Sequence, residues 1–196
     1  FNLMTRKNRK NIILESLASI LEERNMSKVT TALLASECSI TEAALYRHFP
    51  SKRKIYSGLV DFCEQNLFEL TGNINSSKEK SLIKTKKILV VLVTFCEKNP
   101  GLARLLTREA FSVDETSLDE RIKLLMSKIE LQIKQNLQKF EQESKKKLAL
   151  STASSANLLL ACAEGLIQQY VRSGFEDLPT KRANEQIDFL IHSLSS

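Results

Sequence analysis

Apolar residues recur at three- and four-residue steps along most of the chain, which is the spacing of one face of an α-helix. The pattern is regular over residues 13–21, 55–70, 118–140 and 187–194. Only five Gly and three Pro interrupt the 196 residues. We therefore predict an all-α fold of about nine helices, with no strands.

One stretch, residues 88–96 with the sequence ILVVLVTFC, is apolar on nearly every side. Its β-branched residues would suit a strand, but no partner strand is in sight, so we predict a buried central helix. Asn99 and Pro100 predict the start of the next helix, as N-cap and first helical residue. Residues 72–77, GNINSS, predict a turn that ends the preceding helix.

Two short helices joined by a tight turn are predicted within residues 30–54, TTALLASECSITEAALYRHFPSKRK. Thr31 and Thr41 are suitable N-caps for the two helices, and residues 38–40 form the turn. Leu45 and Phe49 are four residues apart, so they share the inward face of the second helix.

The residues that follow end this motif and begin a third helix. Pro50 ends the second helix because it biases the residue before it away from helical geometry. Ser51 then caps a helix whose first turn carries Lys52, Arg53 and Lys54. Helix N-termini favour bound phosphate. Three cations there oppose the helix dipole by themselves, so they are best explained by an anion that binds to them.

Two helices in this arrangement can place the second one in the major groove of DNA while their flanks contact phosphates. Thr41 and Ala44 lie where base edges are read, and Glu42 either accepts from a cytosine amino group or lies outside. Tyr46 is either a phosphate contact or a half-buried packing residue, and Arg47 is either a contact or solvated. The DNA-binding candidates are Arg6, Lys7, Arg9, Thr30, Thr31, Thr41, Ala44, Tyr46, Arg47, His48 and Lys52.

The net charge of +6 is unevenly distributed along the chain. Residues 1–55 hold ten Lys/Arg against five Asp/Glu, and the other residues hold nineteen against eighteen. From the sequence we expect the excess positive charge to lie around the two short helices, as a nucleic-acid surface requires.

No other chemistry stands out in the sequence. The four cysteines, Cys38, Cys63, Cys96 and Cys162, stand singly, so we predict buried, reduced thiols in a reducing cytosol. We expect no metal, no cofactor and no enzymatic activity, because no ligand spacing, Gly-rich phosphate loop or catalytic set is apparent. No apolar run approaches a membrane span, and no signal peptide is visible.

The stretch TTALLASECSITEAALYRHFPSK resembles the helix-turn-helix of the TetR-type bacterial regulators. Together, EAALYRHFPSK, EKNPGLARLLTREA and ACAEGLIQQYVRSGF resemble the SlmA family of nucleoid occlusion factors. The resemblance implies a TetR-like fold, with a DNA-binding domain over residues 1–53 and a dimerisation and partner-binding domain over residues 54–196. These families usually place Gly where this chain has Ser39, so the turn is expected to be strained or differently shaped.

The resemblance also implies partners. Such proteins bind palindromic double-stranded DNA as homodimers, here through the last two helices, in the cytoplasm on the nucleoid, and antagonise the division protein FtsZ. Phe62 and Lys98 are candidates for an apolar anchor and a contact to an acidic tail, unless Phe62 is core and Lys98 solvated. Leu70 stands where a basic residue is expected. The FtsZ-tail candidates are Phe62, Leu70, Val91, Lys98 and Asn99.

Two other functions fit parts of the pattern. A TetR-type repressor would release DNA when its C-terminal domain binds a small apolar or cationic effector. A helical interaction scaffold would not bind DNA in a salt-dependent way.

Overall fold

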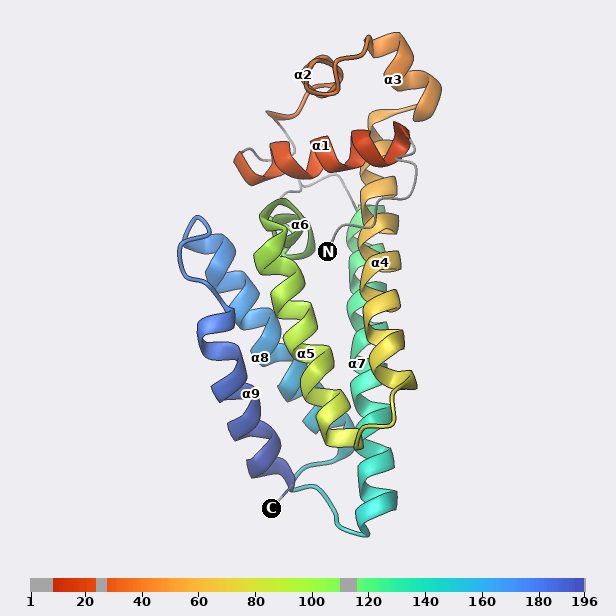
Figure 1. Cartoon of the computed structure of the whole chain (residues 1–196). Coiled ribbons are helices and arrows are strands. Elements are labelled where there is room, and N and C mark those ends of the chain that lie inside the picture. The colour runs from red at the N-terminus through yellow and green to blue at the C-terminus, as the bar shows by residue number, and fades with distance from the viewer. Residues whose placement is uncertain (1–8, 24–27, 110–115, 196) are drawn as a thin grey trace. The chain divides into compact units, whose positions relative to one another are not determined.

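The computed structural model describes residues 9–23, 28–109 and 116–195. Within these ranges the chain forms helices and no strand, which confirms the all-α prediction (Figure 1). The helices are α1 (Arg9–Glu23), α2 (Thr31–Glu37), α3 (Glu42–His48), α4 (Lys52–Ser76), α5 (Ser81–Lys98), α6 (Pro100–Leu106), α7 (Thr116–Ser144), α8 (Thr152–Arg172) and α9 (Thr180–Ser195).

The chain divides into two compact units. Unit 1 comprises residues 1–64 and 99–121, and unit 2 comprises residues 65–98 and 122–196. The helices α4 and α7 each contribute residues to both units. The functional boundary expected between residues 53 and 54 stays a prediction.

In unit 1, α1 packs against α2, α3 and α6. Its apolar face is buried as the spacing predicted, with Leu17 and Leu21 fully inaccessible to solvent. Leu45 of α3 is also fully buried and Phe49 is nearly so, which confirms their inward orientation. Burial of these side chains is the main force that holds three short elements together.

The contact between α1 and α6 depends on Gly101. A Cβ atom at Gly101 would lie 1.9 Å from the carbonyl oxygen of Ala18, so no larger residue fits at this crossing. Arg104, one turn further along α6, donates from Nη1 to the carbonyl oxygen of Leu21 at 2.9 Å. That carbonyl is in the last turn of α1, where no helical N–H is available to it. The NPGLAR stretch therefore fixes α6 to the end of α1.

In unit 2, α5 packs against α8 and α9, and α8 packs against α9 (Figure 1). Ile88, Leu89, Val93 and Cys96 of α5 are fully buried, which confirms the predicted central helix. The long helix predicted over residues 118–140 is also confirmed, since Leu118 and Leu137 are both buried within α7.

The turn predicted at residues 72–77 is wrong, because α4 continues through this segment to Ser76. Tertiary contacts hold the last turn in helical form. Asn75 donates to Gln132 at 2.9 Å and accepts from Asn136 at 3.0 Å. The buried Lys84 donates from Nζ to the Asn75 carbonyl oxygen at 2.7 Å. These bonds outweigh the cost of about 1 kcal/mol for a glycine such as Gly72 inside a helix.

Candidate nucleic-acid interface

The helix-turn-helix consists of α2, the connecting residues 38–41 and α3, all in unit 1. The N-cap of α2 is Thr30 and not Thr31, since the Thr30 hydroxyl accepts from the Leu33 amide at 3.1 Å. Thr41 caps α3 as predicted, and its hydroxyl accepts from the Ala44 amide at 3.2 Å. The helix α3 ends at His48, just before Pro50, as predicted.

The turn contains a left-handed residue that is not glycine. Ser39 has a φ of 52°. Its amide donates to the carbonyl of Ser36 at 3.0 Å, and the Ile40 amide donates to the carbonyl of Ala35 at 3.0 Å. This pair of bonds is the Schellman ending of a helix. The turn thus has the closure that glycine normally provides, at a conformational cost of about 1–2 kcal/mol.

A side-chain bond joins the two helices of the motif. Thr31 Oγ1 donates to Glu42 Oε2 at 2.6 Å. The bond holds the Glu42 carboxylate beside the start of α2, which accounts for an acidic residue on an otherwise basic surface.

The predicted contact residues of α3 differ in exposure. Thr41, Tyr46 and Arg47 are exposed, and Tyr46 has 44% of its surface accessible. Ala44 and His48 are half-buried. A tyrosine this open leaves its hydroxyl accessible to a phosphate.

Two shallow hollows in unit 1 bring the remaining candidates together. Thr30, Thr31 and Lys52 line one hollow, with the Lys52 ammonium 5.9 Å from the centre of the Tyr56 ring. Arg9 and His48 line the other.

The cap of α4 adds to the first group. Ser51 accepts from the Lys54 amide at 3.2 Å, as its predicted capping role requires. Lys10, which sequence reasoning did not select, lies with its ammonium 5.7 Å from the centre of the Phe49 ring. Arg6 and Lys7 lie outside the described residues.

The candidates for a tail-binding site fall in both units and are described separately. In unit 1, Phe62 is half-buried on α4 and Asn99 precedes α6 as its N-cap. In unit 2, Leu70 is exposed on α4, Val91 is half-buried on α5, and Lys98 is exposed at the end of α5.

The cysteines are free thiols, but the prediction that all four are buried is wrong for two of them. Cys63 and Cys96 are buried, and burial raises the pKa of Cys96 to about 12. Cys38 is half-exposed at the end of α2, and Cys162 is half-exposed on α8, where its thiol donates to Gln186 Oε1 of α9 at 3.8 Å. Among the described residues no group of His, Cys, Asp or Glu has the arrangement of a metal site. None of the described helices has the length and apolar character to cross a membrane.

Two family models match successive parts of the chain. Residues 13–59 match the model of the bacterial regulatory proteins of the tetR family, and residues 79–195 match the SlmA-like form of the tetracyclin repressor-like C-terminal domain. The chain is 41% identical over 190 residues to nucleoid occlusion factor SlmA of Colwellia psychrerythraea, covering 97% of this chain and 96% of that protein. The chain belongs to the SlmA family of nucleoid occlusion factors.

Other relatives agree with this assignment. The SlmA protein of Shewanella pealeana is 42% identical, with 95% of each chain covered. Among solved structures, the regulator FadR of Bacillus subtilis has a TM-score of 0.79 over 93% of this chain and 98% of its own, at 13% identity. A putative TetR-family regulator from Rhodococcus sp. also has a TM-score of 0.79, at 15% identity, over 97% of this chain and 100% of its own. At such low identity these structures establish the TetR-like fold, which confirms the predicted fold class.

Proposed function

We propose that the protein binds palindromic DNA on the nucleoid and there inhibits FtsZ assembly, so that no division septum forms over the chromosome. The observation that carries this proposal is the 41% identity to a nucleoid occlusion factor over 97% of the chain, which extends well beyond the helix-turn-helix. The name of that relative supports the nucleoid function, and the FtsZ partner follows from the resemblance of the three stretches described above.

The DNA contacts of the proposal come from unit 1. Thr41 and Ala44 would face base edges in the major groove, since Thr41 caps the N-terminus of α3 and Ala44 lies in its first turn. Tyr46 and His48 would contact phosphates at the other end of α3, and Lys52 would reach a phosphate from the first turn of α4.

The homodimer of the proposal uses α8 and α9. Support comes from large apolar side chains that are exposed there: Phe189 of α9 has 69% of its surface accessible and Leu158 of α8 has 39%. Exposed aromatic residues of this kind are unfavourable in water and are typical of protein interfaces. A two-fold axis would present two copies of α3 to a palindrome.

The inhibitor function is tested by sedimenting FtsZ polymers with GTP, with and without a palindrome selected by the protein itself. DNA-bound protein is expected to reduce the pelleted FtsZ more than DNA-free protein does. Polymers that resist the DNA-bound protein, together with no affinity for the FtsZ tail, would contradict the FtsZ part of the proposal.

Matched variants locate the tail contact. Lys98→Gln is expected to weaken binding of an acidic FtsZ-tail peptide, whereas Lys123→Gln on the exposed side of α7 is not. Leu70→Arg restores a cation that the resemblance leads us to expect and should strengthen binding. Leu124→Arg, at a leucine that is 55% exposed, is its control. Equal effects within each pair would remove these residues from the proposed site.

The TetR-like fold also serves repressors that are released from DNA by an effector. In that case DNA binding would change when small apolar or cationic compounds are added, and FtsZ polymers would be unaffected. The same assays therefore separate the two functions.

A further inference from the structure

The net positive charge is divided unevenly between the two compact units. Unit 1 includes the acidic segment 99–121 and holds thirteen Lys/Arg against twelve Asp/Glu. Unit 2 holds sixteen Lys/Arg against eleven Asp/Glu. Unit 2 therefore carries most of the net positive charge when residues are grouped by compact unit, while residues 1–55 keep the excess expected around the helix-turn-helix.

Much of the excess in unit 2 lies at one end, where α4 connects to α5 and α7 connects to α8 (Figure 1). The two connections are in contact, since Ser81 Oγ at the start of α5 donates to Glu143 Oε2 near the end of α7 at 3.1 Å. We call the exposed lysines of these connections the lysine end: Lys78, Lys80, Lys145 and Lys146.

The acidic residues at this end already have cationic partners. Glu79 binds Lys87 at 2.6 Å, Glu141 binds Lys147 at 3.2 Å, and Glu143 lies 3.8 Å from Lys139. Within the described part of the chain, no acidic side chain pairs with a member of the lysine end. The four lysines thus lie exposed on two connections that are in contact, and no ion pair among the described residues neutralises them.

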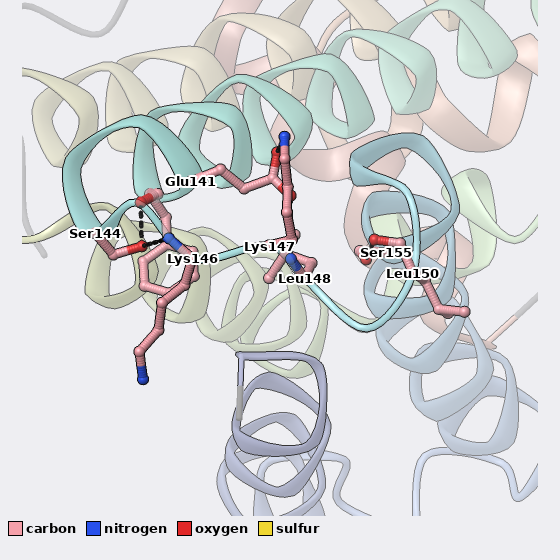
Figure 2. A network of polar contacts seen from close by, with 8 residues as sticks. Glu141, Ser144, Lys146, Lys147, Leu148, Leu150 and Ser155 are labelled. Atoms are coloured by element: carbon pink, nitrogen blue, oxygen red, sulfur yellow. Dashed lines mark hydrogen bonds and ion pairs between the residues drawn. The ribbon is translucent and has the colours of Figure 1, made fainter.

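The loop that carries Lys145 and Lys146 has a defined shape (Figure 2). Lys145 has a φ of 57°, a left-handed conformation that is costly for a residue with a Cβ. Ser144 Oγ accepts from the Lys146 amide at 3.2 Å and donates to the Phe140 carbonyl at 2.8 Å.

Two further bonds fix the far side of the loop. Glu141 accepts from the Leu148 amide at 3.0 Å, and the Ala149 amide donates to the Leu194 carbonyl at 2.8 Å. Lys145 and Lys146 are therefore displayed on an ordered turn and not on a random tail, which lowers the entropic cost of binding a partner.

We propose that the lysine end binds the phosphate backbone of a second DNA duplex while the helix-turn-helix holds the first. Lysine is a compact point charge on a flexible stem, which suits phosphate contact without base readout. A nucleoid-bound protein also has other duplex segments nearby, so that even a weak second contact is occupied. This surface lies in unit 2 and goes beyond the proposed function, which uses unit 1 alone for DNA.

The test uses the full chain bound to an immobilised, selected palindrome at saturation. A fluorescent duplex of about 30 base pairs and unrelated sequence is then added, and its retention is measured against salt. Four phosphate contacts give a log–log salt slope of about −3.6, so the second duplex should bind about a hundredfold more weakly at 200 mM than at 50 mM salt.

Two charge-matched variants locate the effect. Lys145→Gln with Lys146→Gln should reduce the slope by about two and weaken capture about tenfold, whereas Lys123→Gln with Lys134→Gln should change capture less than twofold. Lys145→Gly with Lys146→Gln keeps the left-handed turn accessible and should behave like the first pair. Circular dichroism checks that each variant is folded.

Three results would overturn the proposal. The first is no capture of the second duplex, and the second is an equal loss of capture in the two double variants. The third is displacement of the captured duplex by polyglutamate or anionic vesicles at a lower concentration of negative charge than unlabelled duplex requires. The last result would assign the surface to an acidic protein or a membrane. Failure to bind the palindrome in the first step would instead contradict the proposed function, so the two failures are distinguishable.

Discussion

The substitution Gly101→Ala tests how α6 is held on α1. The added Cβ would lie 1.9 Å from the oxygen and 2.8 Å from the carbon of the Ala18 carbonyl, and 3.2 Å from Leu21 Cβ. Ordinary contact begins at 3.4 Å, so the two helices would have to separate by about 1.5 Å. The atoms in the way belong to the backbone of α1 and cannot rotate aside.

The expected loss follows from two opposing terms. Overpacking of this kind costs about 1–3 kcal/mol or more, and the separation would also lengthen the 2.9 Å bond from Arg104 to Leu21. Alanine recovers at most about 1 kcal/mol through its better helix propensity. We expect Gly101→Ala to lower the free energy of unfolding by about 2–3 kcal/mol.

Urea denaturation followed by far-UV circular dichroism measures this change, with Gly72→Ala as the control. Nothing lies within 4 Å of a Cβ built on Gly72, so that substitution should be neutral or stabilise by about 0.5–1 kcal/mol. If Gly101→Ala unfolds at the same urea concentration as the unmodified protein, the close crossing of α1 and α6 is not what requires glycine.

Four further predictions concern single side chains. Ser39→Gly should raise the free energy of unfolding by about 0.5–1 kcal/mol in urea denaturation, because Ser39 has a φ of 52°. Lys52→Ala should weaken binding to all DNA sequences and reduce the log–log salt slope by about one in fluorescence anisotropy. Phe189→Ser should shift the monomer–dimer equilibrium toward monomer in analytical ultracentrifugation. Phe189 is 69% exposed in the single chain, and the proposed dimer would lose the apolar contact that covers it. The hydrogen bond from the Leu148 amide, and then the bond from Lys147, lower the pKa of Glu141. The ionised Glu141 therefore stabilises its loop fully above the ordinary glutamate pKa, and this stabilisation is lost as the pH falls through the lowered pKa. The NMR shift of the Leu148 amide should follow this titration in the native protein but not in Glu141→Gln.

Different results would contradict each of these. Destabilisation by Ser39→Gly would mean that the serine side chain supports the turn. An unchanged salt slope for Lys52→Ala would remove its phosphate contact. A stable Phe189→Ser dimer would place the interface elsewhere. An acid transition of the Leu148 amide that persists in Glu141→Gln would assign that titration to another group.

The sequence by itself determined the features that depend on neighbouring residues. Helix periodicity, the caps Thr41 and Ser51, and the end of α3 before Pro50 all rest on interactions within a few residues, and each is confirmed. The N-cap of α2 is Thr30 and not the predicted Thr31, an adjacent residue with the same side chain.

Only the tertiary structure decided the features that join distant segments. The continuation of α4 past Gly72 depends on partners from α5 and α7, and the need for glycine at position 101 depends on the backbone of Ala18. The division of charge between the compact units also depends on the fold, because carboxylates such as Asp119 and Glu120 belong to the same unit as the helix-turn-helix. Local spacing determines which residues share a helix face. The energy of a helix–helix crossing or of a charged surface depends on which faces meet, and the faces meet only when the chain is folded.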